Sequence, residues 1–274
     1  MSTGPHMVFD ARYVKKYGHM EMRDSMWDSL TNLGVGPAMG ITAENVADEY
    51  NVTREEMDAY SLRSQQRAVA AIDAGKFKEE IIPVTVHGKK GDITYDTDEY
   101  PRRDASLEKL AKLKPTFKED GRVTAGNASG MNDASSGVIL MSEEKAKEVG
   151  APILARIVSV ATTGVRPEVM GIGPISASQK ALKKAGLTID DIDLFEINEA
   201  FASQCIACAK TLRIDEDKLN VNGSGISLGH PVGATGSRLV VTLLHELKRR
   251  GGKYGLASLC AGGGMGTTVI IEAV

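Results

Sequence analysis

The sequence is poor in cysteine, with three among 274 residues, and two of these, Cys205 and Cys208, stand three positions apart. Three cysteines cannot build the framework of paired bridges that holds a small secreted domain together. The Cys-x-x-Cys pair has no second pair of ligands in the sequence, which argues against a structural zinc site. Cysteine usage therefore favours a reducing compartment, and we predict a cytoplasmic protein.

Excess positive charge and long apolar runs are also missing. The formal net charge is −3, so nothing in the composition points to nucleic acid or to an anionic membrane surface. No apolar stretch approaches the roughly 20 residues needed to cross a bilayer. Residues 1–6 lack the charged-then-apolar layout of a signal peptide. With 42% hydrophobic and 25% charged residues, the composition is that of an ordinary globular protein.

Periodicity divides the chain into a helix-rich first part and an alternating second part. In the first part, Thr53 and Glu56 form a capping-box pattern ahead of a helix that should end at Gly75. From Gly137, short apolar runs alternate with helical patterns, which is typical of a layered α/β domain with a covered sheet. The predicted strands are 81–86, 93–95, 137–141, 156–161, 194–197, 254–259 and 267–273, and the predicted helices of the second part are 143–149, 175–185, 199–212 and 234–250.

Three short segments near the C-terminus each place one chemically capable side chain at the end of a predicted strand. They are centred on Asn198, His230 and Cys260. Three such ends at one sheet edge would form a site. Each residue also has a structural interpretation. Asn198 can cap the following helix, His230 can hydrogen-bond within its own turn, and Cys260 can be a buried inert thiol.

The chemistry of these residues offers a functional interpretation beside the structural one. An asparagine amide can hold a water molecule or donate to a developing oxyanion. The glycines around His230, from Gly223 to Gly236, allow a ligand to approach the backbone closely, and the following helix offers a positive N-terminus. The N–H groups of residues 262–264 would lower the pKa of the Cys260 thiol and form an anion-binding nest.

Six stretches, taken in order, resemble the thiolases, the acetyl-CoA acetyltransferase family. The resemblance covers essentially the whole chain, and the order and spacing of the stretches are specific to that family. The six stretches are Met39–Asn45, Thr124–Gly130, Val169–Pro174, Asn198–Ala202, Gly229–Pro231 and Cys260–Gly264.

The resemblance implies a thiolase-type layered α/β fold and acyl transfer between CoA thioesters by a two-step Claisen reaction. In the first step, one cysteine attacks a thioester and becomes acylated. In the second step, a base removes a proton from the methyl group of another acetyl-CoA, and the carbanion takes the acyl group. The implied substrates are acetyl-CoA and acetoacetyl-CoA, with no cofactor besides the CoA thioester itself.

The resemblance also implies roles for individual residues. Cys260 is the acid/base, His230 is one donor to the enolate oxyanion and helps to activate the nucleophile, and Asn198 holds the water that completes the donor pair. The backbone N–H of Gly262 belongs to a second oxyanion hole, around the acylated cysteine. The residues implied to line the pantetheine tunnel of CoA and its apolar wall are Leu30, Met39, Phe117, Ala125, Ser129, Ala200 and Phe201.

The chain departs from the family pattern in its first part. Thiolases carry a further half-domain before the point where this chain begins, and that half-domain holds the acylated cysteine. The contexts of Cys205, Cys208 and Cys260 do not match the motif of that nucleophile. We therefore expect a truncated thiolase that is inactive alone, unless a partner chain supplies the N-terminal half, and that is a homo-oligomer when complete. Ala38, where acetyl-specific relatives often have histidine, leaves the acyl-chain preference open.

The resemblance further implies three structural parts. Residues 1–125 would form a helix-rich loop domain that binds CoA, residues 126–150 a remnant strand and helix of the N-terminal domain, and residues 151–274 the C-terminal domain. The strand at 137–141 would lack neighbours in this chain, so we expect it either to pair with another chain or to be disordered.

Two other interpretations stay open at this stage. The chain can be a non-catalytic CoA-binding or assembly subunit that keeps the thiolase scaffold, although binding alone does not require Asn198, His230 and Cys260 together. The loop from Gly223 to Gly236 can also suggest a dinucleotide-binding domain. Its glycine spacing does not fit that fingerprint, however, and no acidic residue follows at a suitable distance.

Overall fold

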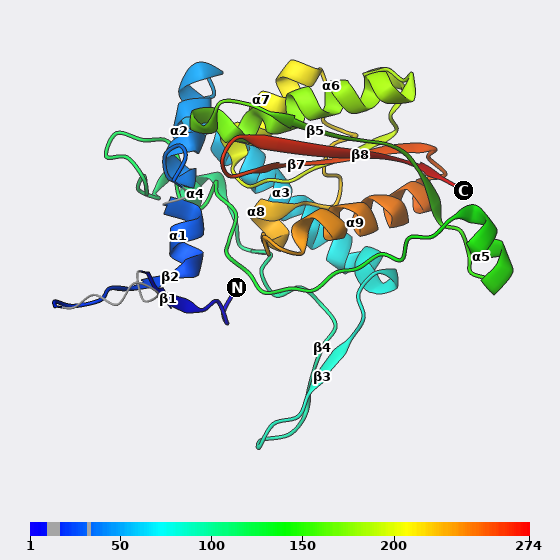
Figure 1. The fold of residues 1–274 in the computed structure, drawn as a ribbon, viewed down its shortest axis with the longest axis horizontal. Coiled ribbons are helices and arrows are strands. Elements are labelled where there is room, and N and C mark those ends of the chain that lie inside the picture. Colours follow the sequence, from blue (N-terminus) through cyan, green and yellow to red (C-terminus); the bar gives the residue numbers. More distant parts are fainter. Residues whose placement is uncertain (10–16, 32–33) are drawn as a thin grey trace.

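The computed structural model describes residues 1–9, 17–31 and 34–274. A four-stranded sheet lies at its centre, in the order β5-β8-β7-β6 (Figure 1). Its strands are β5 (Ala155–Gly164), β6 (Leu194–Ile197), β7 (Tyr254–Ala261) and β8 (Met265–Ala273). Strand β8 is antiparallel to both of its neighbours, whereas β6 is parallel to β7. Because parallel neighbours run in the same direction, the carboxyl ends of β6 and β7 lie at the same edge of the sheet.

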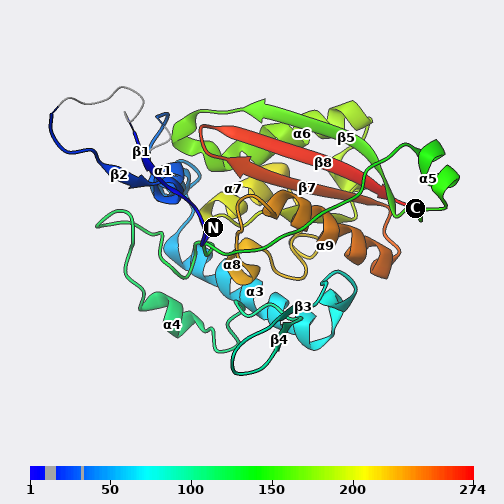
Figure 2. The ribbon, with the colours of Figure 1, turned by 60° about the horizontal axis from the view of Figure 1, so that its bottom comes forward.

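Helices cover the two faces of this sheet (Figures 1 and 2). The helices α6 (Gly173–Ala185) and α7 (Ala202–Leu212) lie on one face, and α9 (Thr235–Arg250) lies on the other. Alternate residues of each strand supply the two cores. On β7, for example, Leu256 belongs to the core on the α6 and α7 side, and Ala257 belongs to the core on the α9 side.

The helix-rich first part packs against one side of this layered unit. Helices α2 (Met39–Glu49) and α3 (Arg54–Asp73) contact α7, and α3 also contacts the short helix α8 (Gly225–Leu228). The predicted capping box is confirmed, because the Thr53 hydroxyl accepts from the Glu56 N–H while the Glu56 carboxylate accepts from the Thr53 N–H. The remaining elements are β1 (His6–Val8), β2 (Met22–Asp24), α1 (Ser25–Thr31), η1 (Lys76–Glu79), β3 (Val84–Val86), β4 (Ile93–Tyr95), α4 (Leu107–Ala111), α5 (Glu143–Val149), η2 (Pro167–Ile172) and η3 (Ile189–Asp191).

The strand predicted at 137–141 is wrong. Residues 131–142 are neither helix nor strand, and this extended segment runs past α9 to α5 (Figure 1). The side chains of Ile139 and Leu140 are 87% and 69% exposed. A strand needs a neighbour for its backbone N–H and C=O groups, and this segment has none among the described residues.

Other predicted elements differ mainly in their ends. The helix predicted at 199–212 begins later, at Ala202, and the strand predicted at 81–86 begins at Val84. Strands β5, β7 and β8 are longer than predicted, whereas β6 has the predicted bounds. Within the described ranges, none of the helices combines the length and the apolar character that a bilayer crossing requires. The division into three structural parts stays a prediction.

Candidate active site

Asn198 lies directly after β6, at the sheet edge where β7 also ends. Its N–H donates to the carbonyl oxygen of Ser258 on β7, 3.0 Å away, which continues the parallel pairing of the two strands. The interpretation of Asn198 as a helix cap is wrong, because α7 begins at Ala202 and its N-cap is Phe201. The Asn198 side chain is fully buried, and it contacts an imidazole instead of a helix end.

That imidazole belongs to His230. The sequence predicted this residue at the end of a strand, and that prediction is wrong. His230 lies in the loop between α8 and α9, where its N–H donates to the carbonyl oxygen of Gly130 at 3.1 Å. The amide nitrogen of Asn198 lies 3.3 Å from Nε2 and 3.4 Å from Nδ1 of the ring. The fold thus brings together a carboxamide and an imidazole that are 32 positions apart in the sequence.

Thr235, the first residue of α9, orients the imidazole, and sequence reasoning missed it. Its Oγ1 lies 2.7 Å from Nδ1 of His230, and it donates its only hydrogen to the carbonyl oxygen of Pro231 at 2.9 Å. A hydroxyl that donates there accepts from the Nδ1–H. Nε2 is consequently the unprotonated nitrogen of the neutral ring. The available signal was a threonine five residues after the histidine, in the first turn of the predicted helix.

The surroundings of His230 keep its imidazole uncharged. Desolvation by burial, followed by the positive charge of Arg238, lowers its pKa from 6.5 to about 4. Arg238 lies three residues after Thr235 on α9, and hence on the same side of that helix. At neutral pH the ring is therefore a proton acceptor at Nε2 rather than a cation.

The carbonyl oxygen of the Asn198 side chain, Oδ1, is buried and receives no hydrogen bond from the part of the chain that the structure describes. A buried acceptor of this kind is usually satisfied by protein or by ordered water. An ideal Cβ on Gly225 would lie only 2.8 Å from Oδ1, so a glycine is needed for α8 to approach the amide this closely. The geometry suits Asn198 to hold a water molecule beside the imidazole.

Cys260 lies on β7 close to the same edge, and its side chain points into the core on the α7 side. Leu259 belongs to the core on the α9 side, so the alternation along the strand turns Cys260 toward the α7 side. There it packs with Ala200 and Phe201, and burial raises the pKa of its thiol to about 12. No hydrogen bond joins this thiol to the imidazole or the carboxamide in the described ranges. The structure therefore joins two of the three predicted side chains by a polar contact and places the third in the apolar cluster of Ala200 and Phe201, which follow Asn198 closely in the chain.

The turn after β7 carries Gly262, whose backbone N–H was predicted to belong to an oxyanion hole. Gly263 and Gly264 have φ angles of 88° and 94°, which lie in the left-handed region that favours glycine. An ideal Cβ on Gly264 would also lie 2.2 Å from the carbonyl oxygen of Val165. Glycine is thus required in this turn by backbone conformation and by space, and the turn starts two residues after the Cys260 thiol.

Four of the seven residues predicted to contact CoA lie together. Met39, Ala200 and Phe201 belong to the same apolar cluster as the thiol of β7. The ring of Phe117 meets the ring of Phe201 edge to face, with centroids 6.2 Å apart. Phe117 also lies against Gly40, where an ideal Cβ would be 2.1 Å from the ring. Residues 39 and 40 therefore supply an apolar contact and the space for an aromatic side chain.

The other three predicted CoA residues lie outside this cluster. The N–H of Ser129 donates to the carbonyl oxygen of Ala200 at 3.0 Å, which ties its segment to the chain that follows Asn198. Ala125 is exposed, and Leu30 is partly buried on α1. The roles of these residues in binding CoA stay predictions.

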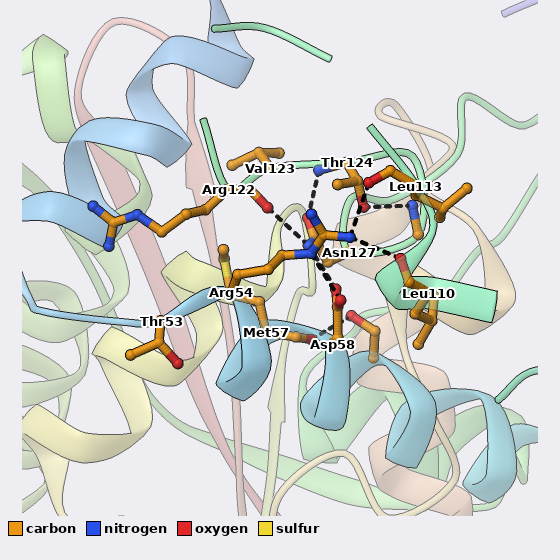
Figure 3. Close-up of polar contacts among 12 residues, drawn as sticks. Thr53, Arg54, Met57, Asp58, Leu110, Leu113, Arg122, Val123, Thr124 and Asn127 are labelled. Atoms are coloured by element: carbon orange, nitrogen blue, oxygen red, sulfur yellow. Dashed lines mark hydrogen bonds and ion pairs between the residues drawn. The ribbon is translucent and has the colours of Figure 1, made fainter. Parts of the chain in front are cut away.

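A buried polar network holds the segment Thr124–Gly130 in place (Figure 3). The amide nitrogen of Asn127 donates to Oδ1 of Asp58 on α3 at 3.0 Å, and its Oδ1 accepts from the Thr124 N–H at 2.8 Å. Arg54 pairs with the other carboxylate oxygen of Asp58 at 2.7 Å. The segment that carries Ala125 and Ser129 is thereby anchored to α3.

A hollow of about 300 Å³ opens beside the loop that carries the imidazole. Its lining residues are Met1, Asn132, Ala134, Ser135, Ser136, Pro231, Gly233 and Ala234. Oδ1 of Asn132 is buried there and has no hydrogen-bond partner among the described residues. In the whole part of the chain that the structure describes, no group of three or more His, Cys, Asp or Glu side chains is suited to hold a metal ion.

Comparison with known proteins gives a consistent result over the whole chain. A family model described as the N-terminal domain of thiolase matches residues 1–144, and one described as the C-terminal domain of thiolase matches residues 151–273. The chain is 58% identical to the acetyl-CoA acetyltransferase of Syntrophomonas wolfei and 55% identical to that of Chromobacterium violaceum. These similarities cover 100% and 99% of this chain, respectively, and 70% of each relative.

Solved structures give the same result for the fold. The crystal structure of the Bacillus anthracis acetyl-CoA acetyltransferase matches with a TM-score of 0.94 at 50% identity, over 98% of this chain and 68% of that one. The human mitochondrial 3-ketoacyl-CoA thiolase in complex with CoA matches with a TM-score of 0.91 at 47% identity, over 100% of this chain and 68% of that one. The predicted thiolase-type α/β fold is confirmed.

Proposed function

The chain belongs to the thiolase family, and from that premise we propose that it transfers acyl groups between CoA thioesters as an acetyl-CoA C-acetyltransferase. The observation that carries this proposal is the contact between a neutral imidazole, His230, and the carboxamide of Asn198. This pair lies at the sheet edge where the strand that bears Cys260 ends.

The chemical problem is to remove a proton from the weakly acidic methyl group of acetyl-CoA. When the C–H bond breaks, the proton goes to a base and the electron pair moves into the thioester carbonyl, which becomes an enolate. The rate therefore depends on a positioned base and on donors aimed at the enolate oxygen. In our proposal the base is Cys260, and the donors are the imidazole of His230 and a water held by Asn198.

The tautomer of His230 gives an order to its two roles. In the resting ring, Nε2 has no hydrogen and can accept the proton of a nucleophilic cysteine as that cysteine attacks a thioester. The imidazolium that results carries an Nε2–H, and this group can then donate to the oxyanion of the second step. Thr235 keeps the ring in the orientation that both steps need.

Burial of Cys260 suits an acid that later becomes a base. With a pKa of about 12, its thiol is protonated at neutral pH and can give its proton to the CoA thiolate that leaves in the acylation step. The thiolate that remains is poorly solvated and therefore strongly basic, which favours proton abstraction from carbon. The enolate carbanion then attacks the acyl group, and the acylated cysteine leaves as a thiolate.

We further propose that the acylated nucleophile is not one of the three cysteines of this sequence. Cys205 and Cys208 are fully buried in α7, and burial raises the pKa of both thiols. The nucleophile would come from a thiolase N-terminal half, on a partner chain or in a longer form of this one, within a homo-oligomer. The exposed segment 131–142 is the surface on which such a half would pair.

The remaining expectations from the sequence stand as proposals. The CoA thioester is the substrate, and the proposed reaction uses no further cofactor. The cytoplasmic location stays a prediction. The non-catalytic alternative is not favoured, because several of the most similar curated relatives are named as acetyl-CoA acetyltransferases.

Proton abstraction can be tested apart from full turnover, with a thiolase N-terminal half supplied so that the acylation step leaves Cys260 as a thiolate. In D₂O, the chain combined with that half should exchange the methyl protons of acetyl-CoA for deuterium, as followed by ¹H NMR. The variant Cys260→Ala should slow this exchange by roughly 10²–10⁴-fold, the usual contribution of a general base. The matched control Cys208→Ala removes a buried thiol from the same region and should leave the exchange rate within about threefold, because that thiol is assigned no part in proton transfer.

Full turnover needs the second half. The N-terminal portion of the Syntrophomonas wolfei relative, fused to or mixed with this chain, should restore thiolysis of acetoacetyl-CoA. Binding of CoA with neither methyl exchange nor restored thiolysis would overturn the proposal and support the non-catalytic subunit instead.

A further inference from the structure

Glu199, the residue after Asn198, has no role in the proposed chemistry, yet it is the best-connected buried carboxylate at the site. We propose that Glu199 is a positioning residue that fixes the carboxamide of Asn198 against the imidazole of His230. Its catalytic consequence rests on the proposed function, whereas its effect on the geometry does not.

Four hydrogen bonds converge on the Glu199 carboxylate, which is 1% exposed. Oε1 accepts from the Tyr60 hydroxyl at 3.0 Å and from the amide nitrogen of Asn220 at 3.1 Å. Oε2 accepts from the Ser64 hydroxyl at 2.6 Å and from the backbone N–H of Ile226 at 3.1 Å. These donors come from α3, from the segment beside β6 and from α8, so one side chain joins three separate parts of the fold.

The connection to α8 matters most for the imidazole. Ile226 is the second residue of α8, and the chain reaches His230 four residues later. Gly225, the first residue of α8, packs against the same corner, since an ideal Cβ there would lie 2.7 Å from the carbonyl oxygen of Glu199 and 2.8 Å from Oδ1 of Asn198. The start of the imidazole-bearing loop is thus both hydrogen-bonded to Glu199 and in contact with its neighbour.

The connection to Asn220 fixes the other partner. Asn220 accepts from the Ile197 N–H at 2.9 Å and donates to the Ile197 carbonyl oxygen at 2.8 Å, which holds the last residue of β6. Its amide nitrogen also reaches Glu199. The turn that presents Asn198 is therefore held on both sides. Asn220 binds Ile197, the residue before Asn198, and the hydrogen bonds of Glu199 hold the residue after it.

The donor set requires a carboxylate rather than an amide. The Ile226 N–H and the Asn220 amide nitrogen can only donate, and each of them faces a different oxygen of Glu199. In a glutamine, one of these oxygens would be replaced by an NH₂ group in either orientation of the amide. One of the two donors would then face a donor, and a buried donor without an acceptor is costly. Burial raises the pKa of the Glu199 carboxyl, while the bonds from Ser64, Ile226, Tyr60 and Asn220 oppose that rise.

Glu196 provides a matched control on the same strand. It is also fully buried, but its Oε2 has no hydrogen-bond partner among the described residues. Desolvation raises its pKa well above the usual range, so a glutamine there reproduces the protonated acid. Among the described residues, no side-chain hydrogen bond joins Glu196 to α8. If the substitution of any buried carboxyl group near the site were sufficient, Glu196→Gln and Glu199→Gln would behave alike.

The experiment compares Glu199→Gln, Glu196→Gln and the unsubstituted chain by ¹⁵N NMR of the histidine rings and, with a thiolase N-terminal half supplied, by methyl exchange of acetyl-CoA. We expect Glu199→Gln to change the His230 Nδ1 and Nε2 shifts, to speed hydrogen exchange of the Ile226 amide, and to lower the maximal rate of methyl exchange at least tenfold. The acetyl-CoA concentration at half-maximal rate should change less than threefold. Glu196→Gln should leave the His230 shifts and the rate unchanged.

Unchanged His230 shifts in Glu199→Gln, or equal changes in both variants, would overturn the positioning role. If Glu199→Gln does not fold, Tyr60→Phe serves instead, because it removes one of the donors to Glu199. It should change the His230 shifts by a smaller amount. Unchanged His230 shifts in Tyr60→Phe would overturn the inference. If the unsubstituted chain exchanges no methyl protons even with the N-terminal half supplied, the proposed function fails, and the NMR comparison still decides the role of Glu199.

Discussion

Strand β6 and residues 137–141 are both short apolar runs, and the sequence predicted a strand at each, but only β6 is one. Its four residues are buried and pair with β7. The second run is exposed and has no strand beside it among the described residues. An apolar run becomes a strand only where neighbouring backbone groups complete its hydrogen bonds, so the fold of each run depends on distant parts of the chain.

The same contrast extends to polar groups. After β6, Asn198 and Glu199 are fully buried, and the donors to the Glu199 carboxylate come from α3, α8 and Asn220. Along residues 131–142, Ser136 bonds to the start of α9, while most of the side chains are exposed. The region after β6 fixes the positions of buried polar side chains at the candidate site, whereas residues 131–142 form an exposed surface.

The largest difference should appear when the same methyl group is added to each region. Gly225→Ala should lower the free energy of unfolding by about 2–3 kcal/mol, because the methyl group would overlap backbone and side-chain atoms that cannot easily move. In Gly137→Ala, nothing lies within 4 Å of the new methyl group among the described residues, and the change should stay under about 0.5 kcal/mol. Urea unfolding followed by circular dichroism measures both, and equal effects would contradict the contrast.

The second prediction concerns pH. His230 has a pKa of about 4 in the folded chain against an ordinary value of 6.5, so the unfolded chain binds more protons between these values. The folded state should therefore lose stability as the pH falls from 6.5 to 4, by about 3 kcal/mol in all from this residue. His230→Asn should remove that loss.

The measurement must compare variants, since other groups titrate in the same range. Burial raises the pKa of Glu80 from 4.5 to about 7. Its contribution has the opposite sign, because the folded state loses stability as the pH rises between these values. The control His87→Asn changes an exposed histidine of the β3–β4 hairpin and should retain the pH dependence of the unsubstituted chain. Parallel curves for His230→Asn and the unsubstituted chain would refute the prediction.

A smaller effect is expected when one hydroxyl is removed from the buried network. Tyr60→Phe removes a donor to Glu199 and a contact to the Cys205 sulfur, and should cost about 1–2 kcal/mol. Thr85→Val removes an exposed hydroxyl contact to Thr94 on the β3–β4 hairpin and should cost less than about 0.5 kcal/mol. Thermal unfolding distinguishes the two, and a reversed order would count against the importance of burial.

The smallest effect is expected in the exposed segment itself. Ile139→Ser should change the free energy of unfolding of the isolated chain by less than about 0.5 kcal/mol, because the side chain is already exposed. The same variant should weaken association with an added thiolase N-terminal half, measured by titration calorimetry, if that half covers this surface. Unaltered association would exclude Ile139 from the interface.

Local patterns predicted those parts of the fold that local forces determine. The capping box at Thr53 and the bounds of β6 followed from short-range signals, namely cap residues and an apolar run between turn residues. The fate of residues 137–141 did not, since it depends on a neighbour. The layer that Cys260 enters could not be predicted either, because it depends on where β7 begins its alternation relative to the two cores.

The candidate site was only partly accessible from the sequence, for a similar reason. Its three reactive side chains could be named, and Asn198 and His230 do meet. Thr235 and Glu199 were missed, although both stand close to those residues in the sequence. Their importance lies in partners, such as Tyr60 and Ser64 on α3, that no local spacing relates to them.

The burial of the Cys260 thiol has a consequence for reagents that target thiols. Alkylating agents and peroxides react with the thiolate, and a pKa of about 12 leaves almost none of that form at neutral pH. Cys260 is also buried, in one apolar cluster with Ala200 and Phe201. Covalent reagents that need an accessible thiolate should therefore react slowly with Cys260 in the resting protein.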